Sequence, residues 1–234
     1  MKHTELRLTA DGSHTLYVQT WDETYHSHHG AIQESEHIFI DRALRHCDKK
    51  QISVFEVGFG TGLNAFLTLE AAVKQDLKIR YETLELFPIP MEQAVQLNYP
   101  DLVNPMLTHE FELLHTCHWN EEVALTPNFL FTKYRADFTS FADWGTYDVI
   151  YFDAFSPEKQ PEMWCEDRFA ELYKHCNEGA ILTTYCSKGV VRRALQTVGF
   201  QVERLDGPPG KREMLRARKG FLPLESSSPN DLRS

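Results

Sequence analysis

The sequence predicts an α/β fold: a mostly parallel sheet with helices on both faces, a closing antiparallel pair of strands and an N-terminal β-hairpin extension. Three observations lead to it. Apolar runs typical of strands alternate with segments of helical spacing between residues 51 and 199. The first run passes through three glycines into an amphipathic helix, as in doubly wound sheets. The last two runs are joined by the short turn GPPGK, so they should pair antiparallel.

The elements of the first half follow in order. Residues 6–19 carry the turn pair Asp11-Gly12 between alternating segments, which predicts a hairpin, and a histidine-rich loop comes next. The remaining segments are a strand, glycine loop and helix over 52–75, a strand over 79–86, a helix over 88–97, and strands over 111–116, 128–137 and 147–155. We therefore expect residues 1–50 to be an extension packed on the core.

The second half continues the alternation. It is expected to contain a helix over 161–176, a strand over 179–186, a helix over 187–199 and the closing pair 200–205 and 213–219. These elements complete a main domain over 51–222. Residues 223–234 are polar and rich in serine, which predicts a disordered tail.

Composition bounds the class of protein. With 234 residues and 42% hydrophobic content, the chain can form one sizeable core. No stretch approaches the roughly 20 apolar residues of a membrane span, and the start lacks the apolar segment of a signal peptide, so a soluble, cytoplasmic protein is expected. The five cysteines are widely spaced without a CxxC pair, which indicates neither a disulfide framework nor a zinc site.

The net charge of -10 disfavours a protein that coats nucleic acid through general basicity. Residues 186–220 reverse this balance, because they hold nine basic and three acidic residues. Such a run is commonly only a solvated face. It also leaves one face able to meet phosphates, and both interpretations stay open on charge alone.

Four acidic residues stand at predicted strand ends, where ligands gather in open α/β sheets. Glu56 ends the first strand beside the glycines, Glu85 ends the second, Asp137 follows the third and Asp153 follows the fourth. One such acid is often only a helix cap or a turn former. All four together with the glycine loop predict a ligand site along this edge.

The spacing of the glycines limits which class of ligand the site could bind. Gly58, Gly60 and Gly62 form GxGxG, whereas a dinucleotide site prefers GxGxxG and has a glycine near the position that Asn64 occupies. A ribose diol could donate to a carboxylate that ends the second strand, and an exocyclic amine to one that follows the third, with Phe138 covering a ring. These needs describe an adenosine without phosphates, which S-adenosylmethionine supplies.

The runs EVGFGTGLN (56–64), DAFSPEKQPEMW (153–164), PGKREML (209–215) and TYHSHHGAIQESEHIFI (24–40) resemble the methyltransferase family that completes 5-methylaminomethyl-2-thiouridine at the tRNA wobble position. The resemblance implies a Rossmann-like S-adenosylmethionine-dependent methyltransferase fold. It also implies methyl transfer to the amine of a 5-aminomethyluridine at position 34, with the tRNA anticodon stem-loop as partner. Because the chain ends near residue 234, we expect it to lack the flavin-dependent oxidase half of the bifunctional enzyme, and we expect a separate enzyme to supply the aminomethyl substrate.

The site residues expected from these arguments fall into three groups. Asp153 is the catalytic candidate, because a carboxylate aimed at the amine favours the charge that develops during transfer. The expected cofactor residues are Tyr25, Glu56, Gly58, Phe59, Gly60, Gly62, Asn64, Glu85, Asp137, Phe138, Asp153 and Ala154. The expected substrate residues, which shape the base pocket or meet phosphates, are Glu34, Phe155, Pro157, Lys159, Trp164, Lys188, Arg192, Lys211 and Arg212.

Several alternatives stay open at this point. A polyamine synthase, a methyltransferase for another small molecule or protein, and a non-catalytic RNA-binding protein would share this fold class. Phe155 and Trp164 could be core residues instead of walls of the base pocket. The close trio His26, His28 and His29 invites a metal site, but a single loop gives no spacing that makes three ligands converge, so no metal is expected.

Overall fold

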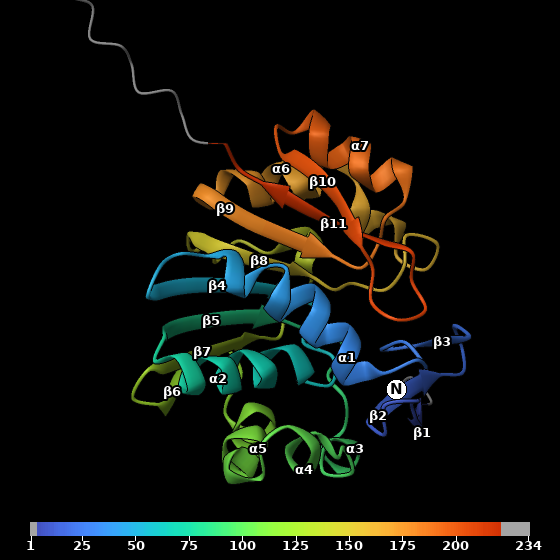
Figure 1. Ribbon diagram of the computed structural model, residues 1–234, viewed down its shortest axis with the longest axis vertical. Coiled ribbons are helices and arrows are strands. Elements are labelled where there is room, and N and C mark those ends of the chain that lie inside the picture. Colours follow the sequence, from blue (N-terminus) through green and yellow to red (C-terminus); the bar gives the residue numbers. More distant parts are fainter. Residues whose placement is uncertain (1–3, 221–234) are drawn as a thin grey trace, which may run out of the picture.

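The computed structural model describes residues 4–220, and its centre is an eight-stranded sheet with the order β10-β11-β9-β8-β4-β5-β7-β6 (Figure 1). The strands are β4 (Gln51–Val57), β5 (Lys78–Leu84), β6 (Glu122–Thr126), β7 (Phe129–Tyr134), β8 (Tyr147–Phe152), β9 (Cys176–Thr184), β10 (Gln201–Asp206) and β11 (Glu213–Arg218). From β9 to β7 every pairing is parallel, whereas β10, β11 and β6 join antiparallel. The predicted fold class, with its closing antiparallel pair, is confirmed.

Both faces of this sheet are covered. On β8, Val149 and Tyr151 belong to one hydrophobic cluster, and Ile150 and Phe152 belong to the other. This alternation explains why residues 149–152 are all apolar, as in parallel strands buried on both faces. Within residues 4–220 the seven α-helices are α1 (Ala31–Ser35), α2 (Leu63–Gln75), α3 (Met91–Ala94), α4 (Tyr99–Val103), α5 (Thr108–Thr116), α6 (Glu166–Lys174) and α7 (Gly189–Thr197).

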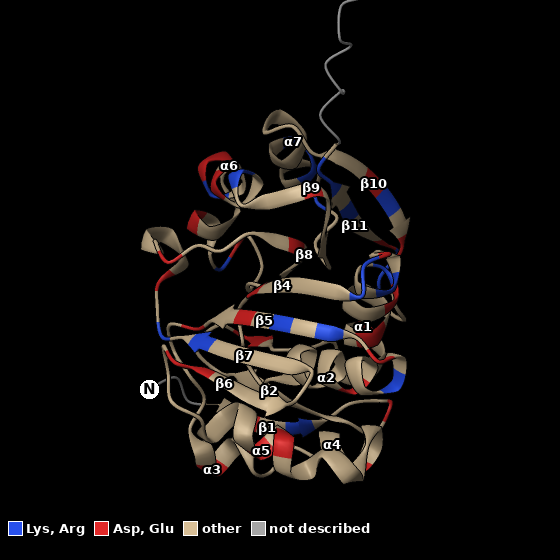
Figure 2. Ribbon diagram, turned by 90° about the vertical axis from the view of Figure 1, so that its left-hand side faces the viewer, with Lys and Arg blue, Asp and Glu red and all other residues tan. Residues whose placement is uncertain are grey.

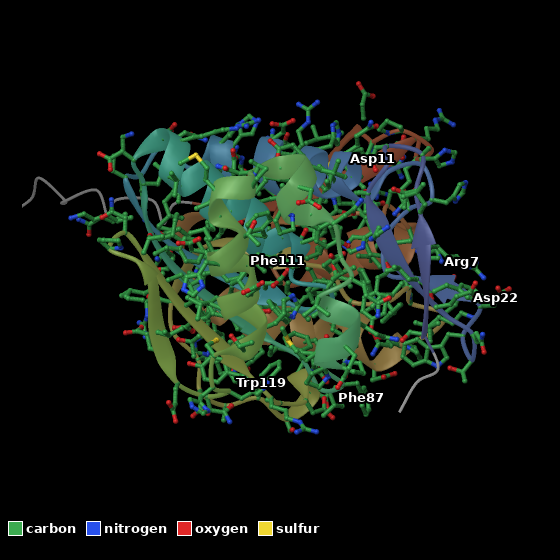
Figure 3. The ribbon with its side chains drawn as sticks, turned by 90° about the horizontal axis from the view of Figure 1, so that it is seen from below. Arg7, Asp11, Asp22, Phe87, Phe111 and Trp119 are labelled. Atoms are coloured by element: carbon green, nitrogen blue, oxygen red, sulfur yellow. The ribbon has the colours of Figure 1, made fainter. Side chains whose placement is uncertain are left out.

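The N-terminal segment forms a separate antiparallel sheet of β1 (Thr4–Leu8), β2 (His14–Val18) and β3 (Glu23–Thr24). The predicted hairpin is confirmed: Gly12 takes a φ of 83° in its turn, where the Asp11 carboxylate accepts the Ser13 amide at 3.0 Å. On its outer face the Arg7 guanidinium lies 3.5 Å from the centre of the Tyr17 ring, whose hydroxyl donates to Asp22 at 2.7 Å (Figure 3).

Some expected elements were wrong or incomplete, and other elements were not predicted. Residues 111–116, expected as a strand, lie in helix α5, where Phe111 and Leu114 occupy one buried face. A short apolar run fits either period, and here helical packing decides. The expected helix over 88–97 shrinks to α3, and the helical stretch from Ala31 to Asp41 and strand β6 were not predicted. The expected tail, 223–234, lies outside the described residues.

Between residues 4 and 220 no helix combines the length and the apolar character needed to cross a membrane.

Candidate active site

A cavity of about 590 Å³ opens at the carboxyl ends of the parallel strands. Its walls come from the loops after β4, β5, β7 and β8, from the N-terminal extension and from the β10–β11 turn, which meet at the right-hand edge in Figure 1. The expected site residues that line it are Tyr25, Glu34, Gly58, Phe59, Gly60, Asn64, Glu85, Asp137, Phe138, Asp153, Ala154, Phe155, Lys159 and Lys211. Strand-end placement thus brings segments that are distant in sequence into one space.

The glycine loop is tight because backbone and ring atoms approach it. Gly58 has a φ of 97°, and a Cβ on it would lie 2.8 Å from the carbonyl oxygen of Asp153. Gly60 has a φ of 52°, and its Cβ would lie 3.0 Å from the ring of Tyr25. A side chain at either position would therefore be strained by backbone conformation and by contact. Gly62 does not line the cavity; it precedes α2 in the left-handed conformation.

Glu85 and Asp137 present acceptors along this edge. The Glu85 carboxylate accepts the Gly60 amide at 3.1 Å and the Phe87 amide at 2.9 Å, which fixes its orientation in the cavity wall. One Asp137 oxygen accepts the amide and the hydroxyl of Thr139, each at 2.8 Å. Each Glu85 oxygen and the other Asp137 oxygen can accept a further hydrogen bond. A ribose diol and an exocyclic amine fit this donor and acceptor pattern, so the residues present suit an adenosine.

Asp153 follows β8 directly, and its carboxylate accepts the side-chain amide of Asn64 at 2.8 Å. Burial raises the pKa of Asp153 to about 7; the Asn64 hydrogen bond opposes this rise, Glu34 adds to it and Lys211 opposes it. A carboxyl group with this pKa exchanges its proton near neutral pH. It can therefore accept from an amine and also hold a proton, which an ordinary aspartate does poorly.

Glu56 does not reach the cavity. It is fully buried beneath the glycine loop, where Thr83, Asn64 and Tyr81 approach it, but neither carboxylate oxygen has a partner in hydrogen-bond geometry among residues 4–220. Burial raises the pKa of Glu56 to about 8, so the group is largely neutral at pH 7. Glu56 was expected to contact the cofactor, but in the structure it lies under the glycine loop and away from the cavity.

Aromatic rings shape the outer part of the cavity. The centre of the Phe155 ring lies 4.9 Å from that of Trp21 and 5.0 Å from that of Tyr25, in edge contacts. Trp164 does not line the cavity: it is 4% exposed, packs against Phe152 and donates its indole N–H to the Phe155 carbonyl at 2.8 Å. The core interpretation of Trp164 fits this position, from which it holds Phe155 in place.

The expected phosphate contacts are dispersed. Lys159 and Lys211 line the cavity, whereas Lys188, Arg192 and Arg212, like Pro157, do not. Much of the basic run is ion-paired, and Figure 2 shows acidic and basic segments interleaved on the face it displays. The ion pairs are Lys188 with Glu158, Arg204 with Glu213, Arg216 and Arg218 with Glu203, Lys211 with Glu34, and Lys219 with Glu178. Contact of the five expected residues with RNA stays a prediction.

The structure adds residues that sequence reasoning missed. Trp21 and Glu23 line the cavity from the β2–β3 region, and Tyr185 lines it from the end of β9. Tyr185 could have been found, because it also follows a parallel strand. Trp21 carried no such signal, since its contact depends on how the N-terminal sheet packs.

The histidine loop contributes to the wall. His26 is buried, and burial lowers its pKa to about 4, so it is neutral at pH 7. The rings of His28 and His29 lie 4.0 Å apart at the cavity. In the part of the chain that the structure describes, no group of three histidine, cysteine or acidic residues could hold a metal ion.

Known proteins resemble this chain in sequence and structure. A family model described as S-adenosyl-L-methionine-dependent methyltransferase matches residues 101–220. The tRNA 5-methylaminomethyl-2-thiouridine biosynthesis bifunctional protein MnmC of Delftia acidovorans is 32% identical over 222 residues, and its namesake from Pseudoalteromonas atlantica is 28% identical over 239 residues. The matches cover 87% and 92% of this chain but 33% of each relative. The chain thus spans about a third of the length of these curated relatives.

Among solved structures, the crystal structure of MNMC2 from Aquifex aeolicus matches with a TM-score of 0.75 and 28% identity, covering 96% of this chain and 74% of that one. Spermidine synthase from Thermotoga maritima matches with a TM-score of 0.63 and 12% identity, covering 96% of this chain and 72% of that one, which is a likeness of fold. The family match extends over half of the chain and includes the segment that carries Asp153. The chain therefore belongs to the MnmC methyltransferase-domain family of S-adenosyl-L-methionine-dependent methyltransferases.

Proposed function

We propose that the protein methylates the amine of 5-aminomethyl-(2-thio)uridine at the wobble position of tRNA, giving 5-methylaminomethyl-(2-thio)uridine. One observation carries the proposal: Asp153 shares a cavity with the residues suited to an adenosine, in a chain whose curated relatives are named for 5-methylaminomethyl-2-thiouridine biosynthesis. The reaction needs an amine acceptor beside the methyl donor. Asp153 lines this cavity, and its carboxyl group can accept hydrogen bonds from such an amine.

The residues divide the work between donor and acceptor. Glu85, Asp137 and the glycine loop would hold S-adenosylmethionine, which supplies an electrophilic methyl group on a sulfonium. Positioning of the two reactants then supplies much of the acceleration, on the order of 7 kcal/mol in favourable cases. As the new N–C bond forms and the S–C bond breaks, the nitrogen gains positive charge, which the Asp153 carboxylate stabilises.

The amine must lose a proton before it can attack, because an ammonium has no lone pair. The pKa of Asp153, raised by burial to about 7, lets this carboxyl group take that proton near neutral pH and release it to solvent before transfer, so that an ionised carboxylate again faces the nitrogen as it gains charge. Phe155, held between Trp21 and Tyr25, offers an apolar surface for a base displaced from its stack. Base contact and proton transfer would then occur in the same cavity.

The proposal includes two further elements. Methyl transfer cannot build the aminomethyl group, so a separate enzymatic activity has to supply the aminomethyluridine. A tRNA substrate also implies a cytoplasmic site of action. Phosphate contacts by Lys159, Arg192 and Arg212 would position the anticodon stem-loop without reading its sequence.

The test is an assay with purified protein, isotopically labelled S-adenosylmethionine and tRNA bearing 5-aminomethyluridine, followed by mass spectrometry of the nucleosides. We expect label in 5-methylaminomethyluridine from the wild type and a large loss of label with Asp153→Asn. A parallel reaction with putrescine and decarboxylated S-adenosylmethionine tests the polyamine alternative. Aminopropyl transfer without tRNA labelling would refute the proposed function, and so would unlabelled tRNA with a folded, cofactor-binding protein.

A further inference from the structure

Lys211 forms a partly buried ion pair inside the cavity. Its Nζ lies 2.6 Å from Oε1 of Glu34, and the two side chains are 31% and 8% exposed. The other Glu34 oxygen accepts the Ser27 amide at 2.7 Å. Lys211 Nζ also lies 4.0 Å from the centre of the Tyr185 ring, a cation–π distance. A lysine held by a carboxylate and a ring is already engaged before any phosphate arrives.

The pair joins two segments that are far apart in sequence. Glu34 belongs to α1 of the N-terminal extension, and Lys211 belongs to the β10–β11 turn. The same segments meet again where the His37 ring lies 2.8 Å from the Asp206 carbonyl, and where the ring of His29 fills the space a Cβ of Gly210 would need. The ion pair is therefore part of a continuous contact that closes one end of the cavity.

This contact lies against the segment that carries Asp153. Tyr185, beneath the Lys211 ammonium, donates its hydroxyl to the Ala154 carbonyl at 2.9 Å. The titratable and charged groups that face Asp153 come from five elements: Glu34 from α1, Glu56 from β4, Tyr81 from β5, Tyr185 after β9 and Lys211 from the β10–β11 turn. Lys211 is the cation in this set, and Glu34 and ionised Asp153 together outnumber it by one charge.

We propose that Lys211 is a positioning residue of the methyl-transfer site and not an RNA contact: it holds Glu34 beside Asp153, so that this end of the cavity presents one net negative charge to an incoming amine. The inference rests on the proposed function for the identity of the amine. Its physical reason is independent of it. Two carboxylates without the lysine would repel each other and favour protonation of Asp153, whereas the lysine without Glu34 would favour the ionised form.

The experiment is a carbon NMR titration of the free protein labelled in its aspartate carboxyl groups, with the Asp153 signal assigned through Asp153→Asn. Lys211→Met should raise the Asp153 titration midpoint, and Glu34→Gln should lower it, each by about half a unit to one unit. The double variant Glu34→Gln with Lys211→Met should return near the wild-type midpoint. Lys188→Met, which removes a cation paired with Glu158 outside the cavity, is the matched control and should leave the midpoint unchanged.

Single-turnover methylation gives a second measurement. Lys211→Met should shift the acid limb of its pH profile upward, whereas Lys211→Arg, which keeps the charge, should restore most of the profile. An unchanged Asp153 midpoint in Lys211→Met, with a raised KM for tRNA and a weaker dependence on salt, would overturn the inference and make Lys211 a phosphate contact. Opposite midpoint shifts in a protein that methylates no tRNA would support the ion-pair role while refuting the proposed function.

Discussion

Asp153→Asn should stabilise the protein at alkaline pH while it impairs methyl transfer. The pKa of Asp153 is raised from 3.8 to about 7 by burial. The native state therefore binds this proton more tightly than the unfolded chain does. The contribution of Asp153 to stability is fully present below pH 3.8 and is lost as pH rises toward about 7. Asparagine keeps the shape and cannot ionise, so it avoids that loss.

The size of the effect follows from the shift. About three pKa units at 1.36 kcal/mol each give roughly 4 kcal/mol as an upper bound. The cavity admits solvent, which reduces the penalty for the charged form, so about 1–3 kcal/mol at pH 8 is expected. For a domain of this size, that is a rise of several degrees in Tm. At pH 4 the wild type and the variant should unfold at nearly the same temperature.

Two assays check this reasoning. Thermal unfolding at pH 4, 6 and 8 should show a Tm difference that grows with pH, and single-turnover methylation should fall by roughly 10² to 10⁴ in the folded variant. If Asp153 served only as a turn former, the variant would be destabilised at every pH and would keep its catalytic rate. A variant less stable than wild type at pH 8, or one with near-normal turnover, would refute the reasoning.

The remaining predictions concern the cofactor edge. Glu85→Ala should weaken binding of S-adenosylhomocysteine at least tenfold in calorimetry, because it removes the carboxylate that accepts the Gly60 amide and faces the cavity; tight binding of NAD instead would contradict the site. Gly58→Ala should lose binding through overlap with the Asp153 backbone, whereas Gly12→Ala, with a similar φ and nothing within 4 Å, should keep it. Glu56→Gln should match wild-type stability near pH 4 and exceed it increasingly as pH rises from 4.5 to about 8, because over this range the unfolded chain releases the proton that the native carboxyl group keeps; chemical denaturation across this range decides it.

The fold was predictable where periodicity and chain order agree. The apolar run before Asp153 was predicted as a doubly covered strand from its place in the alternation of strands and helices, and the turn GPPGK between two strand-like segments indicated antiparallel neighbours. Residues 111–116 misled because six residues rich in apolar side chains fit both periods. The helical turns after Gly30 were missed, because the short segment AIQES shows no clear helical spacing of apolar residues. Contacts with the rest of the fold hold it in the helical conformation.

Strand ends made the cofactor edge predictable, since parallel strands place their final residues together. Glu85, Asp137 and Asp153 line one cavity for that reason. The ion pairs could not be predicted from the sequence, because they depend on which segments meet in the fold. Lys211 was one of nine cations in a basic run, and its partner Glu34 lies more than 170 positions earlier. Burial of Trp164 was undetermined for the same reason.

The fold leaves the choice of acceptor to a few side chains. Spermidine synthase shares this architecture over 96% of the chain at 12% identity, so neither the sheet nor the N-terminal extension by itself selects a tRNA amine over a polyamine. The selective groups must be residues that the architecture does not dictate. Glu34 and Lys211 meet this condition, because they come from two segments outside the parallel strands and face the Asp153 carboxylate. Under the proposed function, substitutions of Glu34 or Lys211 should change which amine is methylated and leave the affinity for the cofactor unchanged. Substitutions of Glu85 should weaken cofactor binding and leave the choice of amine unchanged.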